Sequence, residues 1–306
     1  MHTKSTLQTP GVRRTGAIQA SLGEKIFTFV NHIFFILLGL STIFPFINLI
    51  AKSLSSEAAV VSGMVTLFPI DFQIGTYKYV ASNSLFLNAF MVSITVTLVG
   101  SLLALFMTTL AAYPLSKPRL RGRKFFIIMY LFTMLFSGGL IPTYLLMHKL
   151  NLIDKLPVLF LPFMINVYNM LIVKSYFESL PDSLEESAKM DGASNMTILV
   201  RIILPLSMPV LATIALFYAV TFWNDYFTSL IYINSVEMKP LQLYLKELFV
   251  TSTDAFMRTN VDASLNVSPQ SIQAASIILA TLPIIFIYPF LQKYFVKGVL
   301  VGSVKG

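Results

Sequence analysis

The residues best suited to bind a polar solute form a short run inside an apolar stretch of the chain. Trp223, Asn224, Asp225 and Tyr226 lie together in the long segment 197–233. Trp and Tyr offer apolar ring faces with a polar edge, and Asn and Asp add hydrogen-bonding groups. This mix suits a sugar, whose ring has C–H faces and hydroxyl edges. We predict that these four residues lie on a substrate pathway, although an interfacial aromatic belt or hydrogen bonding between helices would explain the same residue types.

A second group of charged residues predicts a short helix between two apolar runs. Pro181, Asp182 and Ser183 are typical of a helix start. Glu185 and Glu186 follow at the spacing of a capping box, in which a side-chain oxygen and a carboxylate satisfy free backbone donors. The helix would be far too short to cross a bilayer, which takes about 20 residues. We therefore expect a small helix at the membrane surface.

Gly192 marks the end of this predicted helix, because glycine can take a positive φ without steric cost. The two faces of the helix differ in character. On the charged side, Glu185 and Lys189 form a favourable pair four residues apart. The small residues on the other side would let another backbone come close. The apolar side comprises Leu184, Ser187 and Ala188, and the charged side comprises Glu185, Glu186 and Lys189.

The elements that must position these residues are membrane spans. Hydrophobic residues make up 56% of the 306-residue chain and charged residues only 12%, whereas a soluble domain carries about 25% charged residues. The composition therefore predicts an all-α integral membrane protein. Gly138, Gly139 and Pro142 interrupt one apolar run, and such a break is tolerated only where protein or a cavity satisfies the freed backbone groups. Six predicted spans cover residues 26–50, 86–113, 125–147, 157–177, a part of 197–233, and 272–294.

The loop 114–124 indicates which ends of the spans face the cytoplasm. It carries several basic residues and no acidic residue, and cytoplasmic loops are enriched in Lys and Arg. We therefore expect this loop and both termini to be cytoplasmic, and the net charge of +8 to reflect orientation, with no nucleic-acid partner. The segment 181–196 is acidic although it should also be cytoplasmic, and contact with a soluble partner would explain its acidity. Residues 1–25 are then a cytoplasmic tail, residues 26–306 form the six-span domain, and the segments near 51–85 and 234–269 are periplasmic.

No residue pattern indicates catalysis or a bound cofactor. The chain has no cysteine, and its three histidines (His2, His32 and His148) are isolated from one another. It also lacks the glycine-rich loop and lysine of P-loop nucleotide hydrolases. We therefore expect no metal site and no ATP hydrolysis by this chain itself.

The region of the predicted short helix resembles a known family. From residue 186 to residue 205 the sequence reads Glu-Ser-Ala, three residues, Gly, nine residues, Ile, one residue, Leu-Pro. This pattern resembles the EAA signature of ABC-importer permeases and departs from it only by a serine in place of the first alanine. The resemblance implies a coupling helix, which sits in a cleft of a cytoplasmic ATPase subunit and passes its closure to the spans. The residues implied in this coupling are Glu185, Glu186, Ser187, Ala188, Asp191, Gly192, Leu204 and Pro205.

Four segments narrow the resemblance to carbohydrate-type importer permeases. They are most similar to the branch that takes up complex oligosaccharides and polysaccharide pieces, with an alginate importer permease as the nearest example. The resemblance implies a multi-pass protein of the bacterial cytoplasmic (inner) membrane, a second homologous permease chain, two ATP-binding subunits that use ATP and Mg²⁺, and an extracytoplasmic solute-binding protein. The chain itself would bind no cofactor and would not be an enzyme. The segments are residues 135–146 (LFSGGLIPTYLL), 166–194, 222–227 (FWNDYF) and 295–306 (FVKGVLVGSVKG).

Two other functions stay open from the residues alone. An ion-coupled secondary carrier would need carboxylates or broken helices near the midplane, and Asp225 is the single candidate carboxylate. A membrane enzyme that acts on lipid-linked sugars would need paired acids or metal ligands at one membrane face. Outside the short helix the sequence offers no such group.

Overall fold

The computed structural model describes residues 21–250 and 268–303, and the regular secondary structure of these residues is helical, with no strand among them. The prediction of an all-α protein is therefore confirmed for this part of the chain. The chain forms two units, residues 1–48 and residues 49–306, and each is described by itself.

Parts of three predicted features lie outside the described residues. They are residues 1–20 of the predicted tail, residues 251–267 of the predicted segment 234–269, and the last residues, 304–306.

Three helices are long and apolar enough to cross a membrane, namely α1 (Leu22–Ser53), α4 (Ser84–Ser116) and α15 (Pro269–Ser303). Three further groups of shorter helices pass the same test together, but each is bent at a break. They are α5 (Arg123–Leu135) with α6 (Leu140–Lys149), bent by 110°; η1 (Leu156–Leu159) and η2 (Leu161–Phe163) with α7 (Val167–Ser179), bent by 51°; and α9 (Asn195–Ile198), η3 (Leu199–Ile203) and α10 (Leu204–Leu206) with α11 (Met208–Asn224), bent by 83°. By length and composition, the described residues thus hold three spans, or up to six if each bent group is one span.

Glycine and proline residues lie at these breaks. Gly139, with φ at +87°, lies between α5 and α6, where the sequence predicts an interruption. Within the predicted span 157–177 the chain is not one continuous helix, because it leaves the α-helical path before Val167. Pro157 and Pro162 each stand in the first turn of a short 3₁₀ segment there, and a proline has no N–H to continue a helical ladder.

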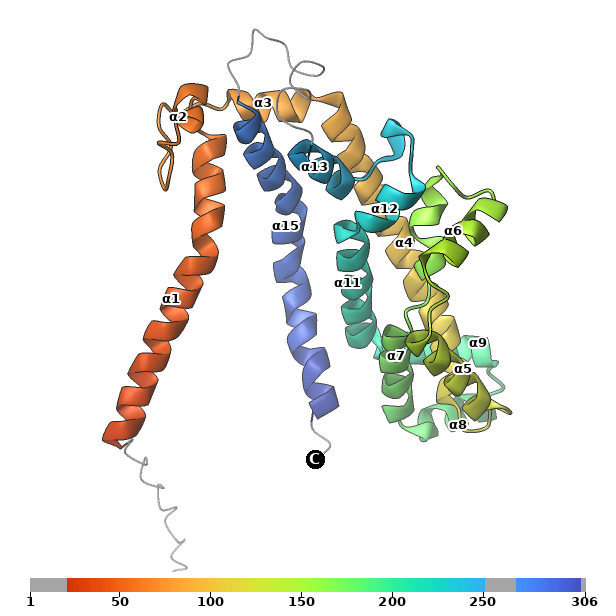
Figure 1. Cartoon of the computed structure of the whole chain (residues 1–306). Coiled ribbons are helices and arrows are strands. Elements are labelled where there is room, and N and C mark those ends of the chain that lie inside the picture. The colour runs from red at the N-terminus through yellow and green to blue at the C-terminus, as the bar shows by residue number, and fades with distance from the viewer. Residues whose placement is uncertain (1–20, 251–267, 304–306) are drawn as a thin grey trace, which may run out of the picture. The chain divides into compact units, whose positions relative to one another are not determined.

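The remaining helices are short and connect the longer ones. In Figure 1, α8 and α5 lie at one end of the second unit, and α3 and α13 lie at its opposite end. Two short helices form within the predicted segment 51–85. The short helices are α2 (Glu57–Val61), α3 (Gly75–Ser82), α8 (Asp182–Met190), α12 (Phe227–Tyr232), η4 (Val236–Met238) and α13 (Leu241–Val250).

The described part of α1 in the first unit, residues 22–48, exposes its apolar side chains along its length. Phe27, Phe34 and Phe44 are all more than half exposed. A helix that is apolar on every side needs lipid or another protein around it. This surface therefore fits a membrane span.

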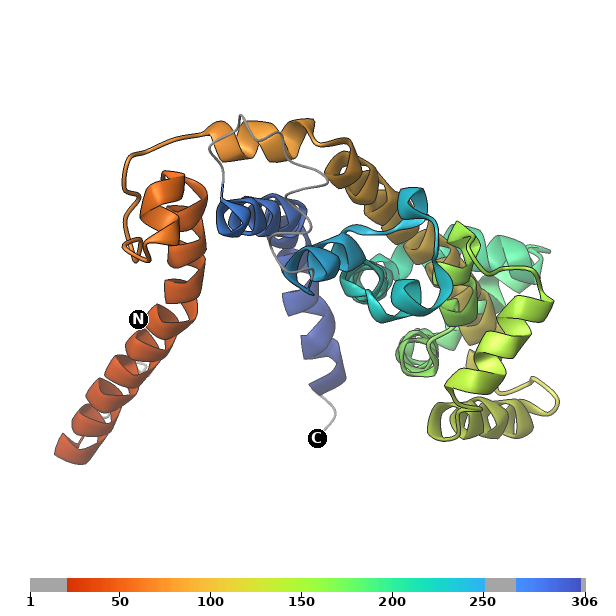
Figure 2. The same ribbon diagram turned by 45° about the horizontal axis from the view of Figure 1, so that its top comes forward.

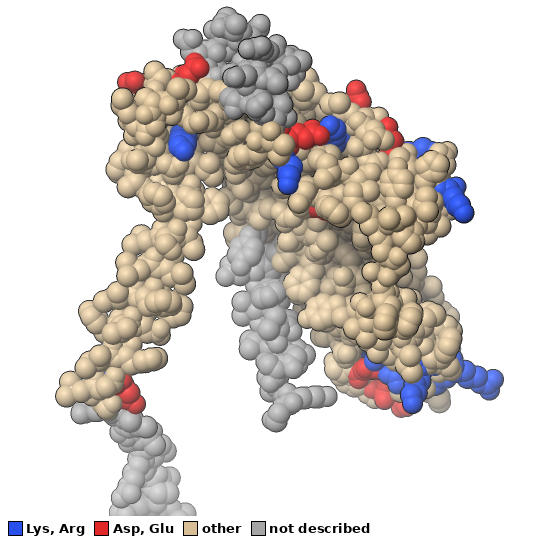
Figure 3. Space-filling model, in the orientation of Figure 1, with Lys and Arg blue, Asp and Glu red and all other residues tan. Residues whose placement is uncertain are grey.

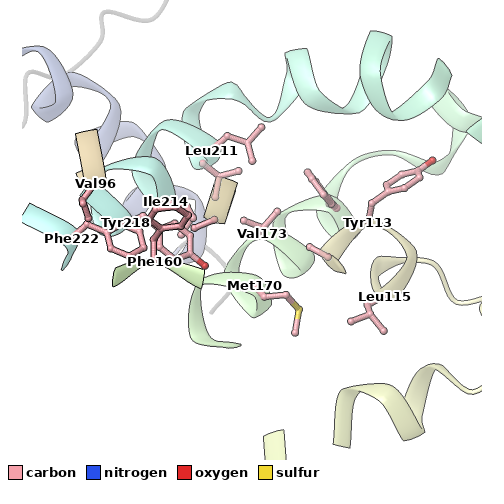
Figure 4. Packing of buried hydrophobic residues seen from close by; sticks show 14 of the residues in the cluster. Val96, Tyr113, Leu115, Phe160, Met170, Val173, Leu211, Ile214, Tyr218 and Phe222 are labelled. Atoms are coloured by element: carbon pink, nitrogen blue, oxygen red, sulfur yellow. The ribbon is translucent and has the colours of Figure 1, made fainter. Parts of the chain in front are cut away.

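The core of the second unit forms where α4 packs along α7 and α11, while α11 also packs along α15 (Figures 1 and 2). Gly100 in α4 permits this packing, because a Cβ atom there would lie 3.0 Å from the Phe160 side chain and 3.1 Å from the Phe222 ring. Figure 4 shows Val96, Tyr113, Leu115, Phe160, Met170, Val173, Leu211, Ile214, Tyr218 and Phe222 in this core.

The hydroxyl of Tyr218 connects these helices by hydrogen bonds. It lies 2.6 Å from Oγ1 of Thr108 in α4 and accepts the backbone N–H of Asn166 at 2.9 Å. Asn166 is in turn the N-cap of α7, since its side chain accepts the N–H of Asn169. One buried phenol therefore joins α4, α7 and α11.

Asp154 joins the turn after α6 to the turn after α12. Its carboxylate accepts the Ser235 hydroxyl at 2.5 Å and the backbone N–H groups of Ser235 and Asn234 at 2.8 and 2.9 Å. The Ser235 hydroxyl contributes most, followed by the two N–H groups, to holding the pKa of Asp154 below its ordinary value. The ionised carboxylate therefore stabilises this connection at the end of the unit where α13 lies.

Candidate functional site

The first candidate site is α8, and its start differs from the prediction. The helix begins at Asp182, and Pro181 occupies the N-cap position with no side-chain hydrogen bond to the helix. The predicted capping boxes of Asp182 with Glu185 and of Ser183 with Glu186 are therefore wrong. Both capping residues lie inside the first turn, where their backbone is already helical. Asp182 and Glu185 still place negative charge near the positive end of the helix dipole.

The end of α8 follows the prediction. Gly192 has φ at +77°, and its N–H donates to the Lys189 carbonyl at 2.9 Å. The N–H of Ala193 reaches back to the Ala188 carbonyl, also at 2.9 Å. These two bonds form a Schellman motif, which needs a residue that tolerates a left-handed backbone. Gly192 therefore ends α8, as the sequence predicts.

The inner face of α8 carries Glu185 and Ala188, the two buried residues of the helix. The Glu185 carboxylate forms ion pairs with Lys117 and with Arg119, the latter at 3.5 Å, and lies 3.8 Å from Nζ of Lys189. The predicted grouping of Glu185 with Glu186 on one charged face is therefore wrong. Glu185 points towards the basic loop after α4, because its charge is neutralised there.

The outer face of α8 is exposed and mixed in character. Leu184, Glu186 and Ser187 lie on it, as do Asp191 and Met190, whose side chain is 89% exposed. Sequence analysis did not single out Met190, although an apolar residue in the charged segment, two residues before the terminating glycine, is a signal that it could have used. The face offers two apolar side chains, Leu184 and Met190, next to carboxylates within a short exposed strip.

The acidity of this region has a partly internal cause. Glu178 at the end of α7 pairs with Arg123 and, at 2.8 Å, with Lys174. Glu178 and Glu185 therefore neutralise basic residues of this chain. A soluble partner is not needed to explain these two acidic residues. Figure 3 shows acidic and basic residues gathered at the end of the second unit where Figure 1 places α5 and α8.

The loop after α4 is held from several sides. Arg119 donates to the side-chain oxygen of Asn195 at 3.4 Å, and Nε of Arg123 donates to the Leu115 carbonyl at 2.8 Å. With the ion pairs of Glu178 and Glu185, these bonds connect the loop to α7, α8 and α9. The loop, α8 and the start of α9 therefore form one electrostatically cross-linked group.

The stretch from α8 to α11 contains two changes of helical geometry. The side chain of Ser194 caps α9 by accepting the N–H of Thr197 at 3.2 Å. The chain then widens into a π-helical turn, η3, immediately before Leu204 and Pro205, and bends by 83° before α11. A proline lacks the N–H for the preceding turn and crowds its carbonyl, and π-helical turns are frequent at functional sites. Leu204 and Pro205 thus occupy the joint between the surface segment and α11.

The second candidate site lies at the other end of α11. The four predicted residues lie at the end of the fifth candidate span: Trp223 and Asn224 are the last two residues of α11, while Asp225 and Tyr226 lie between α11 and α12, which begins at Phe227. The run therefore lies at a helix break. There, Trp223 is buried and its Nε1 has no hydrogen-bond partner among the described residues.

The structure brings three of these four residues to one pocket. A hollow of about 380 Å³ between α11, α13 and α15 is lined by Trp223, Asn224 and Tyr226, and also by Gln242 and Lys246. Asp225 does not line it, and its carboxylate instead accepts the N–H of Thr228 at the start of α12. The pocket thus combines aromatic faces, amide groups and one cation.

Gln242 and Lys246 are functional candidates that sequence analysis missed. They stand four residues apart on α13, and Nζ of Lys246 lies 4.6 Å from the centre of the Tyr226 ring. Such a cation–π contact holds a lysine at an aromatic wall without neutralising its charge. The spacing of Gln242 and Lys246 on a short amphipathic helix could have indicated them, but nothing in the sequence places α13 beside α11.

Neither site has the features of a metal or catalytic centre. Within residues 21–250 and 268–303, no group of three or more His, Cys, Asp or Glu could hold a metal ion. The expectation that this chain binds no cofactor stays a prediction.

Known proteins are similar to this chain along most of its length. The profile of a family described as "Binding-protein-dependent transport system inner membrane component" matches residues 105–301. Protein LplC of Bacillus subtilis (strain 168) is 46% identical over 284 residues, which cover 92% of this chain and 96% of the relative. The polygalacturonan/rhamnogalacturonan transport system permease protein YtcP of the same organism is 41% identical, covering 92% of this chain and 99% of the relative.

A solved structure is also similar. It is described as the crystal structure of a bacterial ABC transporter involved in the import of the acidic polysaccharide alginate. Its matching chain is 36% identical to this one, with a TM-score of 0.84, and the match covers 90% of this chain and 99% of the other.

Proposed function

Because this chain belongs to the family of binding-protein-dependent transport system inner membrane components, we propose that it is the permease subunit of an ATP-driven importer for oligosaccharides or polysaccharide fragments. One observation carries the proposal. The exposed helix α8 is joined through a single bent stretch to α11, and the far end of α11 lines the polar pocket. One continuous segment therefore connects a surface suited to a partner with a hollow suited to a solute.

In this proposal, the outer face of α8 docks on a cytoplasmic ATPase subunit. Glu186, Ser187 and Asp191 contact that subunit, and Gly192 fixes the exit of the chain. Binding of ATP, with Mg²⁺, draws the two ATPase subunits together, and the joint at Leu204 and Pro205 passes this movement to α11. The complex would contain two ATP-binding subunits, a second homologous permease chain and an extracytoplasmic solute-binding protein.

The proposal also fixes the orientation in the inner membrane. The basic loop after α4 and helix α8 lie at one end of the second unit, and α3 and α13 lie at the other (Figure 1). The enrichment of cytoplasmic loops in Lys and Arg favours the α8 end as cytoplasmic, with both termini on that side. Since the chain has no cysteine, single cysteines at Arg121 and at Gly63 can be labelled with a membrane-impermeant maleimide in intact spheroplasts. Labelling at Arg121 and protection at Gly63 would contradict the orientation.

The pocket beside Trp223 favours a saccharide with carboxylate groups. An aromatic ring face stacks on a sugar, while the cation of Lys246 can pair with a carboxylate. Two similar proteins are described as handling polygalacturonan or alginate. We expect Lys246→Gln to weaken uptake of acidic oligosaccharides about tenfold and to leave neutral ones little changed, since an ion pair with a charged ligand group contributes roughly 1.5–3 kcal/mol. Lys149→Gln is the matched control, because Lys149 is exposed and does not line the pocket.

The test of coupling is Gly192→Asp in the reconstituted transporter. Aspartate at φ +77° is strained by about 1 kcal/mol and places negative charge at the negative end of the helix dipole. We expect normal membrane insertion, continued ATP hydrolysis and loss of uptake. Gly63→Asp is the control, because Gly63 also has a positive φ, at +73°, and open space around it. Normal uptake by a well-inserted Gly192→Asp transporter would refute the proposed role of α8.

The ion-coupled carrier is not favoured as an alternative. Its candidate carboxylate, Asp225, accepts the N–H of Thr228 and does not line the pocket. Uptake that persists without ATP and collapses with the ion gradient would restore that alternative.

A further inference from the structure

We propose that the hollow beside the basic loop after α4 binds the phosphate headgroup of an anionic phospholipid. The hollow has a volume of about 520 Å³ and lies between the end of α4, this loop and α9. Three basic residues line it, Lys117, Arg119 and Arg121, and no acidic residue does. It is distinct from the outer face of α8 and from the pocket beside Trp223.

Positive charge remains in this hollow after the internal ion pairs are formed. Glu185 pairs with both Lys117 and Arg119, so a single carboxylate faces two bases. Arg121 is exposed and makes no ion pair or hydrogen bond within the described residues. An anion that enters the hollow therefore meets the unpaired guanidinium group of Arg121 and two bases that share one carboxylate, and guanidinium groups bind phosphate oxygens with directional hydrogen bonds.

A buried hydrogen-bond donor also points to a ligand. Tyr113 lines the hollow and is 9% exposed, yet its hydroxyl has no partner among the described residues. A buried polar group without a partner is costly, and such groups in native proteins usually have an explanation. Figure 4 shows this hydroxyl directed away from the other labelled core residues. A phosphate oxygen in the hollow would accept a hydrogen bond from this hydroxyl.

The rest of the lining favours a lipid over a free phosphate. Leu110, Met196 and Leu199 provide apolar walls below the bases. On α4, Phe106 lies one turn before Leu110 and is 58% exposed, so an apolar strip continues from the hollow along the helix. An acyl chain could follow this strip while the headgroup contacts the bases, as basic pockets near helix ends do with anionic lipids.

The test uses the assembled transporter in lipid nanodiscs. The discs contain phosphatidylcholine with a minor fraction of phosphatidylglycerol, and native mass spectrometry counts the phosphatidylglycerol retained. One basic residue near an anionic surface contributes about 1 kcal/mol, which is about fivefold in binding. We expect Arg121→Gln to reduce retention about fivefold. Lys124→Gln should retain the lipid as the wild type does, because Lys124 belongs to the same loop and is exposed but does not line the hollow.

Tyr113→Phe supplies a second, independent readout. Without phosphatidylglycerol, the variant should be at least as thermally stable as the wild type, because the removed hydroxyl makes no bond within the described residues and is costly to bury. With phosphatidylglycerol, the wild type should gain more stability than the variant. Equal gains would overturn the assignment of this hydroxyl.

Four other results would overturn the proposal. The first is equal retention of phosphatidylglycerol and phosphatidylcholine by the wild type. The second is equal loss of lipid from Arg121→Gln and Lys124→Gln, which would indicate general surface charge. The third is full displacement of the lipid by inorganic phosphate, which would make free phosphate the ligand. The fourth is binding by the isolated chain that disappears in the assembled transporter, which would mean that a partner subunit covers the hollow.

Discussion

The ion pair between Glu185 and Lys117 allows a quantitative test of how α8 is held. Glu185→Gln keeps the size of the side chain but removes its charge, so Lys117 loses its main partner. Removing one member of a fully buried pair costs about 3–5 kcal/mol. Here the side chains of Lys117 and Arg119 are 13% and 53% exposed. Because water partly solvates the two charges that lose their partner, the cost should be smaller. We therefore expect a loss of about 1–3 kcal/mol of stability, with little of it from Arg119, since exposed ion pairs contribute about 0–1 kcal/mol.

Thermal unfolding of the purified chain in detergent, monitored by the fluorescence of its single tryptophan, measures this loss. Glu186→Gln is the matched control, because Glu186 is the neighbouring carboxylate on the exposed face, and surface substitutions usually change stability by less than about 0.5 kcal/mol. Lys117→Met should cost about as much as Glu185→Gln, and the double variant should cost less than their sum. Additive costs in this cycle, or equal stability of Glu185→Gln and Glu186→Gln, would refute the assignment of Glu185 to the inner face.

Three further predictions test other parts of the fold by thermal unfolding. Gly100→Ala places a Cβ about 3 Å from two phenylalanine side chains and should cost about 1–3 kcal/mol by overpacking, whereas Gly39→Ala, with open space, should not destabilise; equal effects would contradict the close packing at α4. Tyr218→Phe removes the acceptor of a backbone N–H and should cost about 1–3 kcal/mol, unlike Tyr168→Phe, where the ring is 57% exposed. The pKa of Asp154 is lowered by its hydrogen bonds, so its stabilising contribution should be complete above the ordinary carboxyl pKa and disappear as pH falls through the lowered value. Asp154→Asn should lack this acid-dependent loss, and an unchanged pH profile in that variant would show that Asp154 is not its source.

What the sequence predicts well is local. The end of α8 depends on one residue that tolerates positive φ, and the break before α6 depends on adjacent glycines, so both follow from short segments. The predicted start of α8 is wrong because several nearby residues can begin a helix. Pro181 sets the first turn one residue earlier than a capping box needs.

What the sequence misses depends on contacts between distant segments. A helical wheel gives the two faces of α8, but only the basic loop, more than sixty residues earlier, decides that Glu185 is the buried carboxylate. In the same way, Trp223 is an evident candidate, while Lys246 becomes one only after α13 packs beside α11. The end of α11 at Asn224 also removes Asp225 from the pocket, since an apolar run does not show where its helix stops.

The ion pairs on one side of α8 and the bent stretch that follows it indicate which parts of the chain would move with this helix. Its inner face is cross-linked through Glu185 to the basic loop, and that loop is cross-linked through Arg123 to the end of α7. The path to α11, in contrast, passes through a π-helical turn and an 83° bend. A force applied to the outer face of α8 should therefore carry the loop and the end of α7 along, and the change of angle should be taken up near Ser207. A partner that moved α8 alone would first have to break buried ion pairs, whereas bending at the joint breaks none that involve Glu185 or Glu178.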